Sequence, residues 1–297
     1  MPFLALAYQS LDGLSVGDAL GERFFGRDAQ QRLERRELPA APWSYTDDTE
    51  MALSVVEVLA QYGRIEPDAL AQAFARRYTP WRSYGPGAHR LLQAFQQGAD
   101  WQTESGRLFG GSGSYGNGGA MRVAPVGAYW GQDLAAARED AERSARVTHS
   151  HPEGIAGSIA VAIAAAIATC IGQGERGRQA PFWSQLLAWV PKGETRRGLE
   201  RAAAIPYERS PPSVAAQLGA GERVSAQDTV PFAIWCAARH LDSYPEAFWA
   251  TASGLGDRDT TCAIAGGIVA PAAQDLPPGW LAVRESLPAL AASERDG

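Results

Sequence analysis

The sequence lacks the usual features of a secreted or nucleic-acid-binding protein. It has three cysteines and no Cys-x-x-Cys pair, which favours buried free thiols in a reducing compartment and predicts a cytoplasmic protein. No run of lysine and arginine occurs, and the net charge is −6, so we do not expect binding to a nucleic-acid backbone. The N-terminal residues contain neither a basic region nor a clear signal-peptide cleavage site.

Long uncharged runs are equally scarce, and the one at residues 155–171 is at the lower length limit of a membrane span. It consists mostly of alanine and has no aromatic belt or basic flank, although both commonly accompany a span. The run therefore predicts a buried central helix of a soluble protein, without membrane association.

Alternating β-branched segments, the pattern of strands, are almost absent, whereas helical spacing of apolar residues recurs along the chain. Connections are short, and we find no flexible linker or fixed-period repeat. We therefore expect one all-α, multi-helix domain over residues 1–297, in which the polar segment 275–297 is the least regular part. The expected helices are 48–62, 67–77, 86–97, 134–146, 152–171, 182–190, 196–204, 230–239, 244–253 and 259–270.

Residues 256–261 place two carboxylates and two hydroxyls directly before a run of small apolar residues that predicts a buried helix. A helix N-terminus favours negative charge because of its free N–H groups and its dipole. A cap needs only one such side chain, however, and hard cations such as Mg²⁺ prefer carboxylate and hydroxyl oxygens. Asp257, Asp259 and Thr260 are therefore candidate metal ligands, with a simple N-cap as the alternative.

A second segment, residues 46–51, has the same chemistry before another apolar helical pattern. Two adjacent aspartates repel each other, and in a partly buried site one would be protonated unless a cation compensated the charge. Thr46, Asp47 and Asp48 are therefore also candidate ligands. Two such clusters could converge on a pair of metal ions, and the alternative is two independent, solvated helix caps.

Residues 109–122 are rich in glycine and lead into an apolar segment. Such glycines, Gly116 among them, allow positive φ and expose backbone N–H groups that can cradle a phosphate, as anion sites before helices do. The segment is not a Walker A loop, because no Gly-Lys-Ser/Thr follows, and no strand precedes it as in a dinucleotide fold. The alternative is a flexible surface loop, but Met121 and Arg122 favour an ordered, functional one.

Residues 148–153 contain two histidines before the long apolar run. Ser150 or His151 is expected to cap that helix, and no further histidine or cysteine nearby supports a zinc site. His149 could hydrogen-bond a ligand from the rim of a site or serve a structural role.

Two other segments contain helix-end signals. In residues 226–235 we expect Asp228 or Thr229 to cap a helix, with Pro231 in its first turn. In residues 17–25, the two glycines that flank Asp18 indicate either a close backbone approach or the end of a helix.

Five of these segments, taken in order, resemble the motifs of the ADP-ribosylglycohydrolases, the family of the dinitrogenase-reductase-activating glycohydrolase and the ADP-ribosyl-acceptor hydrolases. The resemblance spans about residues 14–271, nearly the whole chain. The five segments in this order are specific, whereas any one alone is not. They are G-D-A-L-G (17–21), T-D-D-T-E-M (46–51), G-S-Y-G-N-G-G-A-M-R (113–122), T-H-S-H-P (148–152) and G-D-R-D-T (256–260).

The resemblance implies an all-α fold with a central cleft that holds two Mg²⁺ ions, or Mn²⁺ in their place. It implies a hydrolase that removes ADP-ribose from a modified side chain of a protein substrate, with arginine as the expected acceptor. Nearby carboxylates would stabilise an oxocarbenium-like transition state, and the metals would orient the ribose hydroxyls and activate water.

The resemblance also implies a role for individual residues of this chain. The metals would be held by Thr46, Asp47, Asp48, Asp257, Asp259 and Thr260. The ligand contacts would be Phe109 on the adenine side, Ser114, Tyr115, Gly116 and Asn117 at the diphosphate and ribose, and His149 at the distal ribose or phosphate.

One departure from the family pattern concerns the catalytic residue. Family members usually carry a glutamate a few positions after the Gly-Asp-Ala-Leu-Gly motif, where this chain has Phe25, and the nearest carboxylate is Glu22. Glu22 could reach the metals if the helix ends early or kinks between Gly21 and Gly26. We therefore expect Glu22 to activate the water, with Asp47 as the next candidate and a solvated surface Glu22 as the alternative.

Two other functions are compatible with an all-α protein with acidic segments. The first is a non-catalytic, ADP-ribose-binding or structural relative of the family, which the missing glutamate favours and the intact metal residues disfavour. The second is an isoprenoid-type Mg²⁺ enzyme, which the spacing disfavours because Met51 stands where the third acid of its aspartate-rich motif is required.

Overall fold

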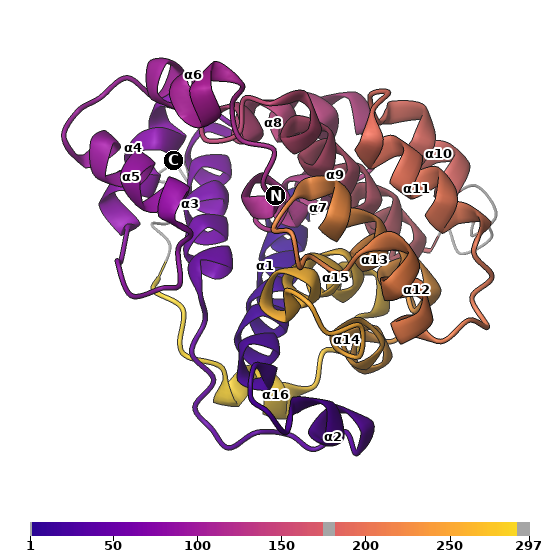
Figure 1. Cartoon of the computed structure of the whole chain (residues 1–297). Coiled ribbons are helices and arrows are strands. Elements are labelled where there is room, and N and C mark those ends of the chain that lie inside the picture. Colours follow the sequence, from indigo (N-terminus) through magenta and orange to yellow (C-terminus); the bar gives the residue numbers. More distant parts are fainter. Residues whose placement is uncertain (1, 175–181, 290–297) are drawn as a thin grey trace.

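The computed structural model describes residues 2–174 and 182–289, and all regular elements in these ranges are helices, as expected (Figure 1). Two isolated bridges, Trp43 with Arg284 and Gly116 with Ser225, accompany them. The helices are α1 (Pro2–Gly21), η1 (Glu22–Phe24), α2 (Ala29–Glu34), α3 (Asp47–Tyr62), α4 (Pro67–Arg77), α5 (Pro86–Gln96), α6 (Trp101–Gly111), η2 (Asn117–Gly119), α7 (Ala124–Trp130), α8 (Leu134–Arg146), α9 (Pro152–Gly172), α10 (Phe182–Trp189), α11 (Glu194–Ala204), α12 (Pro211–Leu218), α13 (Ala226–Arg239), α14 (Tyr244–Ala252), α15 (Arg258–Ala273) and α16 (Pro278–Val283).

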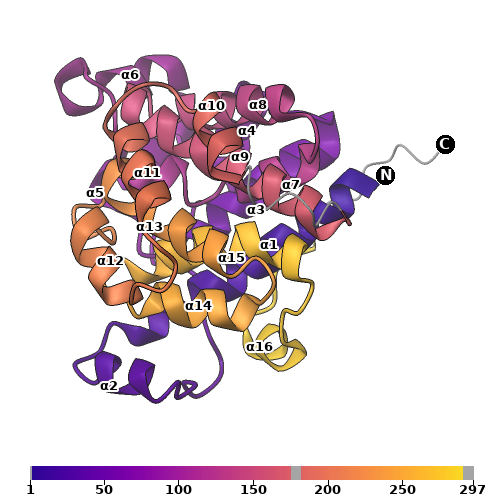
Figure 2. The ribbon, with the colours of Figure 1, turned by 90° about the vertical axis from the view of Figure 1, so that its right-hand side faces the viewer.

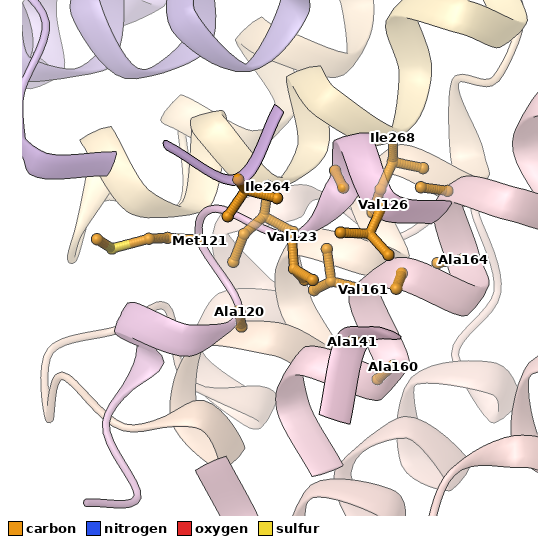
Figure 3. Packing of buried hydrophobic residues seen from close by; sticks show 14 of the residues in the cluster. Ala120, Met121, Val123, Val126, Ala141, Ala160, Val161, Ala164, Ile264 and Ile268 are labelled. Atoms are coloured by element: carbon orange, nitrogen blue, oxygen red, sulfur yellow. The ribbon is translucent and has the colours of Figure 1, made fainter. Parts of the chain in front are cut away.

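Helix α9 lies in the middle of the molecule and packs against α7, α8, α10, α11, α13 and α15 (Figures 1 and 2). It is long and apolar enough to cross a membrane, but 94% of that stretch is buried inside the protein, so the expected buried central helix is confirmed. Helices α7 and α9 pack closely at Gly127 of α7. A Cβ added there would lie 1.9 Å from the carbonyl oxygen of Ala162, so this contact needs a residue without a side chain. Figure 3 shows the apolar side chains of α7, α8, α9 and α15 that meet there.

Helices α1 and α15 form the most extensive helix contact in the described part of the chain. The contact surface of α1 includes glycines at every fourth position, Gly13, Gly17 and Gly21. An added Cβ would lie 2.2 Å from the backbone oxygen of Cys262 at Gly17 and 2.5 Å from that of Arg258 at Gly21. The two backbones are therefore in direct contact, and the C-terminal end of α1 is held beside the N-terminal end of α15.

The segment after α16 is bound to the loop before α3. Glu285 N donates to Trp43 O at 2.8 Å, and the Arg82 guanidinium donates to the Glu285 carboxylate at 2.6 and 2.8 Å and to Tyr45 O at 2.8 Å. The carbonyl of Arg82 in turn accepts from Asp47 N at 2.7 Å. The segment up to residue 289, which we expected to be the least regular, thus helps to fix the start of α3, while residues 290–297 lie outside the described residues.

Every helix expected from the sequence is present, but α1, α2, α6, α7, α12 and α16 were not predicted. Four of these, α2, α7, α12 and α16, have only six to eight residues, too few for a periodic pattern. Helix α1 packs against several neighbours, α3, α7 and α15 among them, so its apolar residues do not form the single stripe that identifies an amphipathic helix.

The predicted start of α13 is wrong. The helix begins at Ala226 after Ser225, so Pro231 lies inside it and neither Asp228 nor Thr229 is its N-cap. Asp228 instead accepts a hydrogen bond from Arg223 N at 2.8 Å. The Pro231 ring packs where Gly198 of α11 leaves room, since a Cβ there would lie 2.6 Å from the proline Cγ. Tertiary packing therefore tolerates a proline that local propensity would exclude.

Candidate functional site

A cleft of about 500 Å³ brings together most of the site residues expected from the sequence. Among the expected residues, Thr46 and Glu22 do not line it. The cleft joins the first turns of α3 and α15 to the glycine-rich segment and to a wall that includes the start of α5. Its lining is Asp47, Asp48, Met51, Ser83, Gly85, Pro86, Gly87, Ala88, Leu91, Leu92, Leu108, Phe109, Ser114, Tyr115, Gly116, Asn117, Gly118, Met121, Thr148, His149, Arg223, Val224, Asp257, Asp259 and Thr260.

The two acidic segments meet in the lining of this cleft. Thr260 Oγ1 lies 3.5 Å from Asp48 Oδ2. Burial, followed by the charges of Asp18 and Asp259, raises the pKa of Asp48 well above its usual value. Burial and the charges of neighbouring aspartates also raise the pKa values of Asp47 and Asp259 well above normal. The first turns of α3 and α15 thus form a buried cluster of mutually repelling carboxylates.

Asp18, to which the sequence analysis gave no role, organises the start of α3. It is fully buried and accepts hydrogen bonds from Thr46 N and Oγ1 at 3.0 and 2.8 Å, and from Thr49 N and Oγ1 at 3.1 and 2.5 Å. Burial raises the pKa of Asp18, although these donors act in the opposite direction. The sequence signal for this role was an aspartate within an apolar helical stretch. Such a carboxylate becomes buried, and a buried carboxylate requires hydrogen-bond donors.

Thr46 holds the acidic segment in place from just outside the cleft. It is the N-cap of α3, and its hydroxyl lies 2.8 Å from Asp18 Oδ1 and 3.2 Å from Asp48 Oδ2. The hydroxyl therefore links the carboxylate of α1 to that of α3. Its expected role as a metal ligand stays a prediction.

The donor atoms of the cluster fit a hard divalent cation. Asp48 Oδ1 and Asp259 Oδ1 are buried and have no hydrogen-bond partner, and leaving a buried acceptor without a partner is costly. Carboxylate and threonine oxygens are the ligands that Mg²⁺ and Mn²⁺ prefer. Within residues 2–174 and 182–289, no group of three or more histidine, cysteine or acidic side chains is arranged so that it could hold a metal ion. The dinuclear metal centre therefore stays a prediction.

The glycine-rich segment begins inside α6, whose backbone leaves the helical conformation at Leu108. Glycines 110, 111 and 113 have positive φ, but Gly116 does not, so the expectation of positive φ at Gly116 is wrong. The requirement there is steric, because an added Cβ would lie 3.2 Å from both Ser114 Oγ and His149 Nε2. Ser114 Oγ also accepts from Gly116 N at 3.2 Å, which stabilises a tight turn.

Hydrogen bonds to residues before and within α13 and to Asp257 order the glycine-rich segment. Asn117 N donates to Val224 O at 3.3 Å, and Ala226 N donates to Tyr115 O at 3.0 Å. The buried Asn117 amide donates to Asp257 Oδ2 at 2.7 Å and to Thr229 Oγ1 at 3.1 Å. Asn117 thus fixes an acidic residue of the cluster through its amide nitrogen, and its expected contact with the ligand stays a prediction.

Two stacked aromatic side chains, Phe109 and Tyr115, form an aromatic platform in the lining of the cleft. Phe109, which has a positive φ of 53° and is 61% exposed, stacks on Tyr115 with 6.1 Å between ring centroids. The lining residues 83, 85–88, 91 and 92 were missed in the sequence, where Gly85, Pro86 and Gly87 were a signal of close approach to a ligand. These surfaces are suited to a flat, apolar ring such as adenine.

The two histidines have separate roles. His151 is the N-cap of α9, because its Nδ1 accepts from Glu153 N at 3.1 Å, which confirms one of the two expected caps. His149 lines the cleft, and its Nδ1 lies 2.7 Å from Thr148 Oγ1. Burial, assisted by the charge of Arg122, lowers the pKa of His149 to about 3. The ring is therefore neutral at physiological pH.

Glu22 lies beside the acidic cluster, although not in the lining of the cleft. Helix α1 ends at Gly21, and Glu22 opens the short helix η1, so the early helix end that we considered is present. Burial, then the charges of Asp18 and Asp257, raises the pKa of Glu22. Phe25 is 47% exposed and lies 4.4 Å from the guanidinium of Arg258, so the position of the expected glutamate is occupied by an aromatic ring.

Comparisons with known proteins place the chain in a family. The profile of the ADP-ribosylglycohydrolase family matches residues 3–295. The chain is 29% identical over 324 residues to ADP-ribosylhydrolase ARH3 of Gallus gallus, which covers 91% of this chain and 86% of the relative. It is 30% identical over 311 residues to ADP-ribosylhydrolase ARH3 of Homo sapiens, with 87% and 82% covered. An uncharacterized protein of Archaeoglobus fulgidus is 28% identical over 286 residues, with 91% and 88% covered.

A solved structure described as an ADP-ribosylglycohydrolase-related protein complex has the same fold. It superposes with a TM-score of 0.64 at 23% identity, covering 96% of this chain and 93% of that one. The family match extends over nearly the whole sequence and includes every segment that lines the cleft. The chain therefore belongs to the ADP-ribosylglycohydrolase family.

Proposed function

We propose that the protein is a metal-dependent hydrolase that releases ADP-ribose from a modified side chain of a protein. Its family supports an ADP-ribose hydrolase. The observation that carries the proposal is the cleft in which buried, unpartnered oxygens of Asp48 and Asp259 lie with the ordered glycine-rich segment and an aromatic platform. Such a cleft offers cation ligands together with space for a nucleotide.

Each part of the cleft would bind a different part of ADP-ribose. Adenine would lie on Phe109 and Tyr115, and the diphosphate would receive backbone and side-chain donors of the segment 114–118 and His149. The distal ribose would then reach Asp47, Asp48 and Asp259, whose carboxylates would stabilise the positive charge that develops at the anomeric carbon. Two divalent cations at these residues and at Thr46, Asp257 and Thr260 would supply Lewis-acid polarisation.

Glu22 is the proposed general base. Its raised pKa lies closer to neutrality than that of a solvated glutamate, which favours proton transfer from water at physiological pH. Asp47 is the next candidate, because it lines the cleft and its pKa is raised further by burial and neighbouring charge.

The proposed acceptor is arginine. An acid-rich site in a protein of net charge −6 attracts a guanidinium, and the raised pKa of Glu22 is partly due to other carboxylates around it. Cys236 and Cys262 are buried thiols outside any disulfide, which supports the proposed cytoplasmic location.

The direct test is incubation of the purified protein with one substrate protein carrying ADP-ribosyl-arginine and another carrying ADP-ribosyl-serine. Free ADP-ribose would be quantified by mass spectrometry in Mg²⁺, in Mn²⁺ and in EDTA. We expect release from arginine only with a metal, and loss of release in Asp48→Ala and Asp259→Ala. Release from serine alone would refute the acceptor, whereas release in EDTA by the wild type and both variants would refute the metal-dependent mechanism.

A non-catalytic ADP-ribose-binding protein is the second candidate, because Phe25 occupies the position of the family glutamate and covers Arg258. Titration calorimetry separates the two functions. ADP-ribose binding without release from any modified protein would favour the second candidate, and turnover would exclude it.

A further inference from the structure

Arg122 is a buried cation without a carboxylate partner among the described residues. Its side chain is fully buried, and its guanidinium donates to Gly118 O at 3.1 Å, to Ser144 O at 2.7 Å and to Thr148 Oγ1 at 2.9 Å. The guanidinium also lies 4.7 Å from the centre of the Phe74 ring. A buried charge is normally paired with an opposite charge. Arg122 is held by neutral acceptors instead, so its burial calls for an explanation of its role.

The hydrogen bond to Thr148 favours one protonation state of His149. Arginine can only donate, so Thr148 Oγ1 accepts from Arg122 and keeps one hydrogen to donate. The acceptor within reach of that hydrogen is His149 Nδ1 at 2.7 Å. A neutral imidazole whose Nδ1 accepts carries its hydrogen on Nε2. The chain of contacts therefore favours the Nε2–H tautomer.

The Nε2 atom faces the glycine-rich segment. A Cβ added at Gly116 or at Gly118 would lie 3.2 Å from it, and His149 lines the cleft. Among the described residues we find no hydrogen-bond partner for this nitrogen. Arg122 additionally holds the Gly118 carbonyl, so one side chain fixes both the loop and the ring that faces it.

We propose that Arg122 and Thr148 are positioning residues that hold His149 as an Nε2–H donor toward an acceptor oxygen of the ligand in the cleft. The identity of this ligand as ADP-ribose, with diphosphate and ribose oxygens as acceptors, rests on the proposed function. The tautomer itself does not, because it follows from contacts within the protein.

Nuclear magnetic resonance of protein labelled with ¹⁵N-histidine tests the tautomer directly, because the chain has only four histidines. The His149→Asn spectrum identifies the signals of residue 149. In the wild type at pH 7 we expect a protonated Nε2 and an unprotonated Nδ1. A protonated Nδ1, or a charged ring, would overturn the proposal.

Matched variants test the role of the two positioning residues. Thr148→Val removes the hydroxyl at nearly constant shape and should produce a mixture of tautomers, whereas Thr148→Ser keeps the hydroxyl and should preserve the wild-type signals. Arg122→Lys should also mix the tautomers, because a lysine cannot reach all three acceptors in the same geometry. If Arg122→Lys does not fold, the comparison of Thr148→Val with Thr148→Ser still tests the proposal. Wild-type signals in Thr148→Val would refute the relay.

Calorimetry with ADP-ribose then separates the inference from the proposed function. We expect Thr148→Val to weaken binding about tenfold and Thr148→Ser to bind as the wild type does. Equal affinities for Thr148→Val and wild type would overturn the donor role of His149. If the wild type shows the expected tautomer but binds no ADP-ribose, the proposed function fails while the assignment of the tautomer stands.

Discussion

The carboxylate cluster predicts that Asp48→Asn stabilises the metal-free protein while it abolishes the response to metal. Asp48 is 1% exposed, and its Oδ1 has no hydrogen-bond partner. An unpartnered buried polar atom costs about 1–3 kcal/mol, more if charged. The amide of asparagine removes the charge and with it the repulsion from Asp18 and Asp259. The loss of one negative charge in the first turn of α3 offsets about 0.3–1 kcal/mol of this gain.

The net gain should be about 1–2 kcal/mol, which corresponds to a rise of roughly 2–3 °C in Tm for a chain of this size. The assay is thermal unfolding followed by intrinsic fluorescence of the nine tryptophans, in EDTA and in excess Mg²⁺ or Mn²⁺. The wild type should be stabilised by metal, because a ligand that binds only the folded state raises its stability. Asp48→Asn should show a higher Tm than the wild type in EDTA and little change with metal.

The pH dependence in EDTA provides an internal check. Burial raises the pKa values of Asp47, Asp48 and Asp259 in the folded protein, so the folded state binds protons that the unfolded chain releases. Stability should therefore fall as the pH rises from about 4 through the raised pKa values, by at most about 1.4 kcal/mol per pH unit for each carboxyl. Metal should reduce this fall.

Asp133→Asn is a matched control. Asp133 is an exposed N-cap that accepts from Ala136 N at 3.0 Å, and asparagine caps as well as aspartate does. Its Tm should stay at the wild-type value with and without metal. A lower Tm of Asp48→Asn in EDTA, together with an undiminished response to metal, would refute the cluster as a shared cation site.

Three further changes probe the scaffold and the catalytic residue. Asp18→Ala removes the acceptor of four buried donors, so urea unfolding should show a loss of about 3 kcal/mol or more, and a loss below 1 kcal/mol would contradict its organising role. Gly17→Ala places a Cβ 2.2 Å from a backbone oxygen of α15 and should destabilise the protein by about 1–3 kcal/mol. The control Gly106→Ala, with open space around its Cβ, should stabilise the protein by about 0.5–1 kcal/mol. Equal effects of the two substitutions would argue against direct contact between the backbones of α1 and α15. Glu22→Gln should reduce turnover by about two orders of magnitude or more at saturating metal and substrate while ADP-ribose binding is retained, and near-normal turnover would leave Asp47 as the next candidate.

The sequence by itself determined the helical class, because the 3.6-residue spacing of apolar residues is a local property of each segment. It also predicted the two acidic segments as candidate cation ligands, since adjacent aspartates at a predicted helix start repel each other whatever the fold, and the cation itself stays a prediction. The cap at His151 followed from local rules in the same way. By contrast, the short helices and the buried α1 lack a one-sided pattern, and they were missed.

Tertiary structure decided which residues meet. The glycines of α1 pack against α15, which brings Asp18 to Thr46 and Thr49, and no local pattern specifies that distance. The same holds for Arg122, whose partners Ser144 and Thr148 come from a different segment. The steric need for glycine at Gly116 arises from His149, more than 30 residues later in the chain, and not from backbone conformation. Residue types and their spacing thus predicted the chemistry, while packing between distant segments set the burial, the charge repulsion and the hydrogen-bond geometry on which the site depends.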